Sequence, residues 1–161
     1  MTDLNDIYNA RIMELAADIP RTDRLVAPDV TATAHSKLCG STVVLDLVLD
    51  GDRVVDYGQT VKACLLGQSS ASVVGREIIG TTREELMAVG GAMRDMLKND
   101  GDGPDGRWED LRVLQPVKAH RARHASTLLV FEAIAKAFAA HDELQATATA
   151  AHEPQPSAVA C

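Results

Sequence analysis

The chain has 161 residues, of which 46% are hydrophobic and only 3% aromatic, so it is long enough for one domain with an aliphatic core. Its 23 acidic and 16 basic residues give a formal net charge of −7, which argues against a nucleic-acid-binding protein and is compatible with docking of a basic partner. No apolar run approaches the roughly 18 residues of a membrane span. Asp3 and Asp6 stand where a signal peptide would carry positive charge, so we expect a cytoplasmic protein that does not bind membranes.

The first part of the chain predicts a helix followed by a small sheet. Apolar residues recur at helical spacing over about 3–18, and prolines in 20–28 then mark an extended connection. The β-branched and aliphatic segment 41–49 predicts a strand, the Asp-Gly-Asp sequence at 50–52 a hairpin turn, and 53–63 one or two further strands. Together these segments predict a three-stranded antiparallel meander.

The second part of the chain predicts helices. Small residues at helical spacing follow Cys64 as far as about Gly80, and Thr82 with Glu85 forms the sequence pattern of a capping box at the start of a third helix. The apolar stripe of that helix consists of Leu86, Val89, Met93, Met96 and Leu97. After a glycine-rich loop and a single helical turn that gives way to a loop ending at Pro116, a last helix is expected to begin within 121–126.

These elements predict an α+β fold, with a small three-stranded antiparallel sheet packed against several helices. We expect one domain over residues 1–144. The remaining segment, 145–161, is rich in Ala, Pro and Thr without apolar periodicity, and its composition predicts a disordered tail.

Two cysteines and two histidines are candidate metal ligands. Cys39 precedes the first predicted strand, Cys64 follows the last, and His120 and His124 are one helical turn apart near the final helix. Cysteine and histidine are the ligands that hold Zn²⁺ or an iron–sulfur cluster. The wide separation of these residues differs from the short spacing of a zinc finger. Each cysteine is therefore also open to interpretation as a small buried hydrophobe, and each histidine as a surface or capping residue.

The predicted meander raises a difficulty for a shared site. Its first and third strands would run parallel, so a residue before the first and one after the third would lie at opposite ends of the sheet. Cys39 and Cys64 would then meet only if the adjoining loops fold over the sheet.

Four motifs in this order resemble the IscU, NifU (N-terminal) and SufU-like family of iron–sulfur cluster assembly scaffolds. The resemblance covers about 4–140, and the long segment near 101–117 is more similar to SufU than to IscU. The motifs are DIYNARIMELAADIPR at 6–21, Cys-Gly-Ser at 39–41 where the family has Cys-Gly-Asp, KACLLGQSSASVV at 62–74, and RARHASTL at 121–128 where the family has Arg-x-Lys-Cys-Ala-Thr-Leu.

The resemblance implies a protein that holds a transient iron–sulfur cluster, with a cysteine desulfurase and recipient iron–sulfur proteins as partners. It implies Cys39, Cys64 and His124 as ligands, with His124 at the position of the family's third cysteine. Ser41 replaces the family's aspartate, so the fourth position is open to Ser41, His120, water or a thiolate of a partner.

Two other functions are compatible with the same motifs. A zinc-bound sulfur acceptor, with Cys64 as the residue that receives a persulfide, would make the chain a zinc-dependent sulfurtransferase, whereas a scaffold need not be an enzyme. A protein that retains the fold without a metal would serve only as an interaction module.

Overall fold

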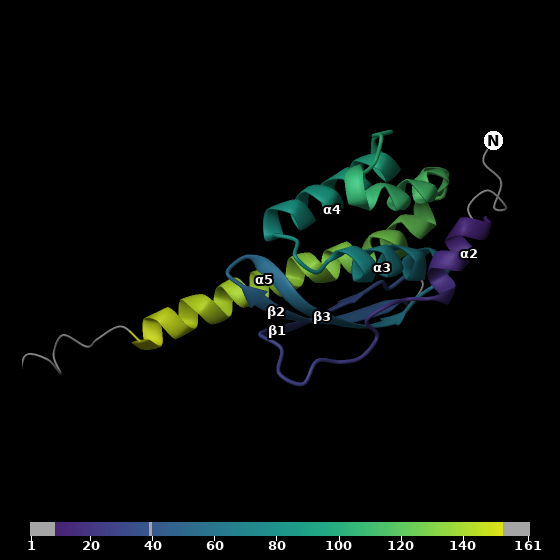
Figure 1. The fold of residues 1–161 in the computed structure, drawn as a ribbon. Helices are drawn as coiled ribbons and strands as arrows, with labels where there is room; N and C mark the ends of the chain where they lie inside the picture. The colour runs from purple at the N-terminus through teal and green to yellow at the C-terminus, as the bar shows by residue number, and fades with distance from the viewer. Residues whose placement is uncertain (1–8, 39, 153–161) are drawn as a thin grey trace, which may run out of the picture.

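The computed structural model describes residues 9–38 and 40–152, which form a three-stranded antiparallel sheet with helices packed on one of its faces (Figure 1). The sheet order is β1-β2-β3, with β1 at Val30–His35, β2 at Thr42–Asp50 and β3 at Arg53–Lys62. The two-residue turn between β2 and β3 contains Gly51 at a φ of 61°, a left-handed conformation that glycine adopts without strain. The predicted α+β class is thus confirmed.

The strand assignment differs from the sequence-based prediction in one respect. β1 lies in a segment for which no strand was predicted, and 53–62 forms a single strand. The sequence of β1, Val-Thr-Ala-Thr-Ala-His, does alternate between buried and exposed residues. Its buried side chains are small, however, and alanine is depleted in strands, so the period-2 signal was weak.

This difference changes where the two cysteine-bearing segments lie. The first residue of β2, Thr42, pairs with His35 at the end of β1 and with Lys62 at the end of β3. The β1–β2 hairpin loop and the segment that follows β3 therefore lie at the same end of the sheet, and the predicted opposite placement was wrong. Cys39 itself lies outside the described residues.

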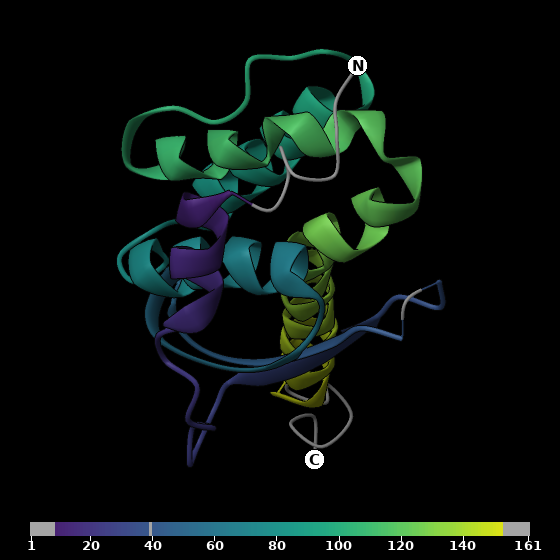
Figure 2. The same ribbon diagram turned by 90° about the vertical axis from the view of Figure 1, so that its right-hand side faces the viewer.

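The helices form two layers above the sheet (Figures 1 and 2). In the inner layer, α5 packs on β1 and β2, while α3 packs on β3 and against α5. In the outer layer, α4 packs on α5, and the 3₁₀ helix η1 packs on both α4 and α3. The bounds are Ala10–Ala17 for α2, Leu65–Glu77 for α3, Arg83–Lys98 for α4, Gly106–Ala119 for η1, Arg121–Arg123 for η2 and His124–His152 for α5.

Local sequence signals account for α2 and α4. The Asn9 side chain accepts a hydrogen bond from Ile12 N at 3.0 Å, and the Thr82 hydroxyl accepts one from Glu85 N at 3.2 Å, so each caps the start of its helix. The structure confirms Thr82 as the predicted cap. The predicted apolar stripe of α4 is confirmed as well, because all five of its side chains are buried.

η1 and α5 are longer than expected. The buried residues of η1 recur every third position, which matches the three residues per turn of a 3₁₀ helix; they are Trp108, Leu111, Leu114 and Val117. α5 continues to His152, beyond the boundary predicted at 144, because the alanine-rich sequence there has high helix propensity. None of the described helices is long and apolar enough to cross a membrane.

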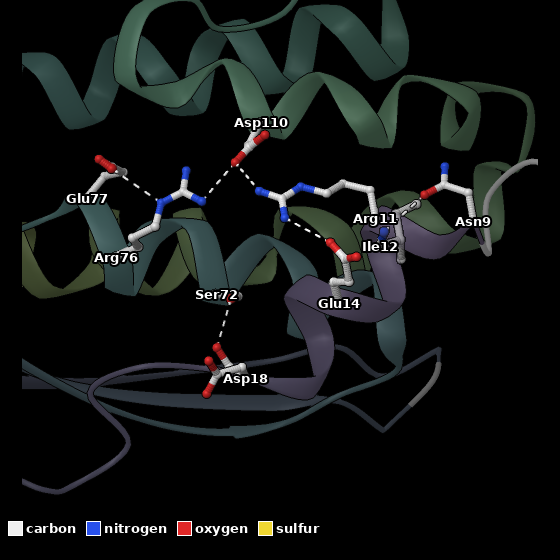
Figure 3. A network of polar contacts seen from close by, with 9 residues as sticks. All are labelled: Asn9, Arg11, Ile12, Glu14, Asp18, Ser72, Arg76, Glu77 and Asp110. Atoms are coloured by element: carbon white, nitrogen blue, oxygen red, sulfur yellow. Dashed lines mark hydrogen bonds and ion pairs between the residues drawn. The ribbon is translucent and has the colours of Figure 1, made fainter.

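An ion-pair network links η1 to α2 and α3 (Figure 3). Asp110 of η1 accepts hydrogen bonds from Arg11 of α2 at 2.7 Å and from Arg76 of α3 at 2.8 Å. The bonds from Arg11 and then Arg76 hold the pKa of Asp110 below its ordinary value. A single carboxylate thus ties together three elements that are distant in sequence.

Candidate functional site

Cys64 stands at the junction of the sheet and the helical layer. Cys64 is the N-cap residue of α3, and Ala63 alone separates it from the end of β3. The backbone therefore holds Cys64 at the end of the sheet where β3 ends. Its thiol is free and partly buried. The sulfur lies 2.8 Å from the hydroxyl oxygen of Ser126, which is only 1% exposed. A thiol and a buried hydroxyl from two different helices are thereby held in contact.

Tight packing between α3 and α5 produces this contact. A Cβ atom added to Gly67 would lie 2.9 Å from the carbonyl oxygen of Ser126, so only glycine permits this approach of the helices. One turn further along α3, the hydroxyl of Ser70 donates a hydrogen bond to the carbonyl of Thr127 at 2.8 Å. The small residues after Cys64 therefore bring α3 close to the first turn of α5.

The His124 side chain forms hydrogen bonds with η1. It is 6% exposed, and its Nε2 lies 3.0 Å from the carbonyl oxygen of Val117 and 3.1 Å from that of Lys118. Because a carbonyl only accepts hydrogen bonds, Nε2 carries the proton, and in the neutral ring Nδ1 holds the lone pair. His124 also lines a pocket of about 670 Å³ together with Leu97, Lys98, Asp100, Lys118, Ala119 and Arg121.

Helix geometry explains why His124 and Ser126 have different neighbours. Side chains two residues apart on an α-helix are related by a rotation of about 200° about the helix axis, so they lie on nearly opposite sides. With Ser126 turned toward α3, His124 points toward η1 and the end of α4. The hydrogen bonds of the described residues accordingly join Cys64 to Ser126 and do not join it to His124. Within 9–38 and 40–152, no three His, Cys, Asp or Glu side chains gather as a metal-binding group.

The other candidate ligands occupy separate positions. His120 precedes η2, and its Nε2 is buried without a hydrogen-bond partner among the described residues. Ser41 is buried, and its carbonyl accepts a hydrogen bond from Ser36 N at 2.8 Å, which closes the β1–β2 hairpin loop. Cys39 lies between Leu38 and Gly40 in the sequence and is outside the described residues, so its role stays a prediction.

The sequence-based analysis did not single out Ser126, although the sequence contains a signal for it. Ser126 is separated from Val130, Ala133 and Ala137 by four, seven and eleven residues, which is the spacing of one helix face. All three of those side chains are buried. Tracing the buried face back to the start of α5 therefore leads to Ser126.

Comparisons with known proteins place these features in context. No family model matches the chain. The zinc-dependent sulfurtransferase SufU of Bacillus subtilis (strain 168) is 25% identical over 136 residues, which cover 84% of this chain and 92% of that protein. The iron–sulfur cluster assembly scaffold protein for the SUF system from Fervidobacterium islandicum AW-1 has a TM-score of 0.74 at 22% identity, covering 84% of this chain and 98% of that one; it supports the fold alone.

A more similar solved structure is the NifU-like protein (N-terminal) from Brucella abortus. Its TM-score is 0.84 and its identity 48%, and the match covers 86% of this chain and 96% of that chain. Identity at this level over nearly the whole length confirms the resemblance noted from the motifs. The chain therefore belongs to the NifU-like (N-terminal) family, within the IscU, NifU and SufU group of iron–sulfur cluster assembly scaffolds.

Proposed function

We propose that this chain is an iron–sulfur cluster assembly scaffold, which holds a transient cluster and passes it to recipient proteins. The observation that carries the proposal is the free thiol of Cys64, held at the start of α3 at the same end of the sheet as the β1–β2 hairpin. In the sequence, Cys39 directly follows Leu38, a residue of the loop that joins β1 to β2. Two cysteines carried by segments that meet at one sheet end are suited to binding a cluster between them.

In this proposal the cluster is cargo, and Cys39 and Cys64 are its thiolate ligands. His124 is the proposed third ligand, which requires either coordination through Nδ1 or loss of the two hydrogen bonds from Nε2. Ser41 and His120 remain candidates for the fourth position, beside water or a thiolate of a partner.

The proposed partners follow from this role. A cysteine desulfurase would supply sulfur, and apo forms of iron–sulfur proteins would receive the cluster. The proposed site of this activity is the cytoplasm.

A zinc-bound sulfur acceptor is the second candidate, and it is favoured by the likeness to the Bacillus subtilis zinc-dependent sulfurtransferase. Zinc prefers four ligands, with several thiolates or imidazoles among them. The described part of the chain contributes Cys64 with a hydroxyl at 2.8 Å, and no group of three metal-binding side chains. Those residues alone do not fit a zinc centre, so this candidate depends on Cys39 and His124 converging on Cys64.

Metal and sulfide analysis of protein purified without air tests both candidates. For a scaffold we expect iron and acid-labile sulfide with visible charge-transfer absorption after reconstitution, lost in C39A and C64A and retained in the control C161A. Near-stoichiometric zinc without sulfide would instead support the sulfur acceptor. Absence of both iron and zinc would refute both candidates.

The variant H124A tests the third ligand separately. If His124 binds the cluster, H124A should lose absorption and bound iron as C64A does. If H124A binds as much iron as the wild type while remaining folded, His124 is not a ligand, and its role is to anchor α5 to η1.

A further inference from the structure

We propose that Ser126 is a positioning residue for Cys64. The Ser126 hydroxyl forms a hydrogen bond with the Cys64 thiolate while that thiolate accepts a sulfur atom from a persulfide donor. This inference rests on the proposed function, because it assigns Cys64 the step in which sulfur enters the site. It adds a residue from α5 that the motif comparison did not identify.

In the structure, the hydrogen-bond partner of the Ser126 hydroxyl is the thiol of Cys64. Ser126 is 1% exposed, so water competes little for its hydroxyl, and the sulfur of Cys64 lies 2.8 Å away. Among the described residues, the other hydroxyls at this helix contact bond to backbone carbonyls: Ser70 to Thr127, and Thr127 to Arg123. Ser126 differs from these residues because its hydroxyl meets a thiol.

The chemistry of a hydroxyl suits this role better than metal coordination. A serine hydroxyl has one proton to donate, whereas neutral serine is a poor ligand for soft metals that prefer thiolates. When Cys64 reacts as a thiolate its sulfur has no proton, so in that form the Ser126 O–H is the donor of their hydrogen bond. This hydrogen bond fixes the rotamer of Cys64 and leaves other lone pairs on its sulfur free to attack the persulfide.

The sulfur-transfer step balances without an oxidant or reductant. The Cys64 thiolate attacks the terminal sulfur of a persulfide donor, R–S–SH, and a new S–S bond forms on Cys64. The donor's own S–S bond breaks, and its electron pair leaves with R–S⁻. The proton stays on the transferred sulfur, so the products are a Cys64 persulfide and a donor thiolate.

The test uses the full chain and inorganic polysulfide as the probe. After a timed reaction, alkylation traps thiols and persulfides, and trypsin separates the three cysteines into peptides 38–53, 63–76 and 137–161. Mass spectrometry then gives the rate of persulfide formation at Cys64, with Cys39 in the same molecule as an internal reference.

Removal of the hydroxyl should slow the reaction at Cys64 selectively. In S126A we expect the Cys64 rate to fall about tenfold relative to Cys39, the size of effect expected for losing a hydrogen bond to a charged group. S70A is the matched control, because it removes a buried hydroxyl from the same helix contact without touching Cys64. Equal Cys64-to-Cys39 ratios in S126A and wild type would overturn the proposal.

A second variant tests the geometry independently of sulfur transfer. In S126C the new thiol should form a disulfide with Cys64 on mild oxidation, whereas A125C, on a different side of α5, should not. Failure of the S126C disulfide would refute the juxtaposition itself. A wild type that binds no iron or zinc would refute the proposed scaffold and zinc functions, whereas an unchanged Cys64-to-Cys39 ratio in S126A would refute the role of Ser126 alone.

Discussion

At the scale of single residues, Asp46 is the one buried carboxylate among the residues that the structure describes. Its side chain is 0% exposed and accepts two hydrogen bonds from Arg24, one from Leu25 N and one from the Thr31 hydroxyl, at 2.6–3.0 Å. Burial would raise its pKa, but the bonds from Arg24, Thr31 and Leu25 together outweigh burial and hold the pKa below its ordinary value. Asp46 thereby anchors the segment after α2 to the sheet.

Substitution D46N should therefore destabilise the protein by about 2 kcal/mol at neutral pH, because the amide loses the charge and matches fewer of the four donated bonds. Urea unfolding measures the change. The exposed, ion-paired Asp142 provides the control variant D142N, for which we expect a change below about 1 kcal/mol. Similar losses in the two variants would contradict the role assigned to Asp46.

The pH dependence of stability follows from the same lowered pKa. A carboxylate with a depressed folded-state pKa stabilises the protein above the ordinary Asp pKa of about 4, and this contribution is lost as the pH falls through the lower value in the folded state. Wild type should thus lose stability on acidification more steeply than D46N. Unfolding curves between neutral pH and pH 3 measure the two slopes, and parallel slopes would contradict the argument.

How far the site was predictable also depends on individual residues. Cys64 at the start of a small-residue helix could be predicted, because strand and helix patterns meet at that residue. The environment of His124 could not, because its bonds to the carbonyls of Val117 and Lys118 depend on how η1 packs. Ser126 was missed because the motif comparison emphasised a cysteine position, whereas contact with α3 depends on which face of α5 is buried.

At the scale of elements, the contact between α3 and α5 determines where Cys64 lies. A Cβ at Gly67 would meet Ala63 Cβ at 2.8 Å and Ser126 O at 2.9 Å, both closer than real Cβ contacts. At Gly91 of α4, by contrast, an added Cβ would meet nothing within 4 Å. Replacement of each glycine by alanine should therefore change the stability of the protein in opposite directions in the two helices.

G67A should destabilise the protein by about 1–3 kcal/mol because it forces the two helices apart. G91A should stabilise it by about 0.5–1 kcal/mol because alanine has the higher helix propensity. Thermal and urea unfolding of both variants measures these changes. If G67A were as stable as G91A, the close packing of α3 on α5 would be wrong, and with it the contact between Cys64 and Ser126.

The predictability of each element depends on the strength of its periodic signal. α4 was predicted with its cap and its buried stripe, because Thr82 and five apolar residues all follow the α-helical pattern. β1 was missed because its buried residues are mostly alanine, and η1 was underestimated because its apolar period is three rather than 3.6. In both cases tertiary packing compensates for weak local preference.

At the scale of the whole molecule, Asp110 links η1 to α2 through Arg11 and to α3 through Arg76 (Figure 3). All three side chains are between 31% and 45% exposed, so solvent screens the pairs and each is expected to contribute less than about 1 kcal/mol. D110N should therefore destabilise the protein modestly, and the loss should shrink at high salt. Urea unfolding at low and high salt provides the measurement, and a salt-independent loss would contradict an electrostatic origin.

The C-terminal part of α5 provides the last prediction, because the domain predicted from sequence ends at 144 whereas the helix continues to His152. Residues 145–148 are exposed, and Leu144 is itself 53% exposed, so this part of the helix buries little apolar surface. The buried face of α5 ends with Phe138, which packs in the core. Removal of residues 145–161 should therefore change the free energy of unfolding by less than about 0.5 kcal/mol, as expected for surface changes. Reconstitution with iron and sulfide should be unchanged, because Cys39, Cys64, His124 and Ser126 all remain.

A truncation after Ala133 is the contrasting variant: it removes Ile134 and Phe138 from the core and should unfold the protein. If truncation at 144 were also strongly destabilising, the last turns of α5 would belong to the domain, and the boundary predicted from composition would be wrong.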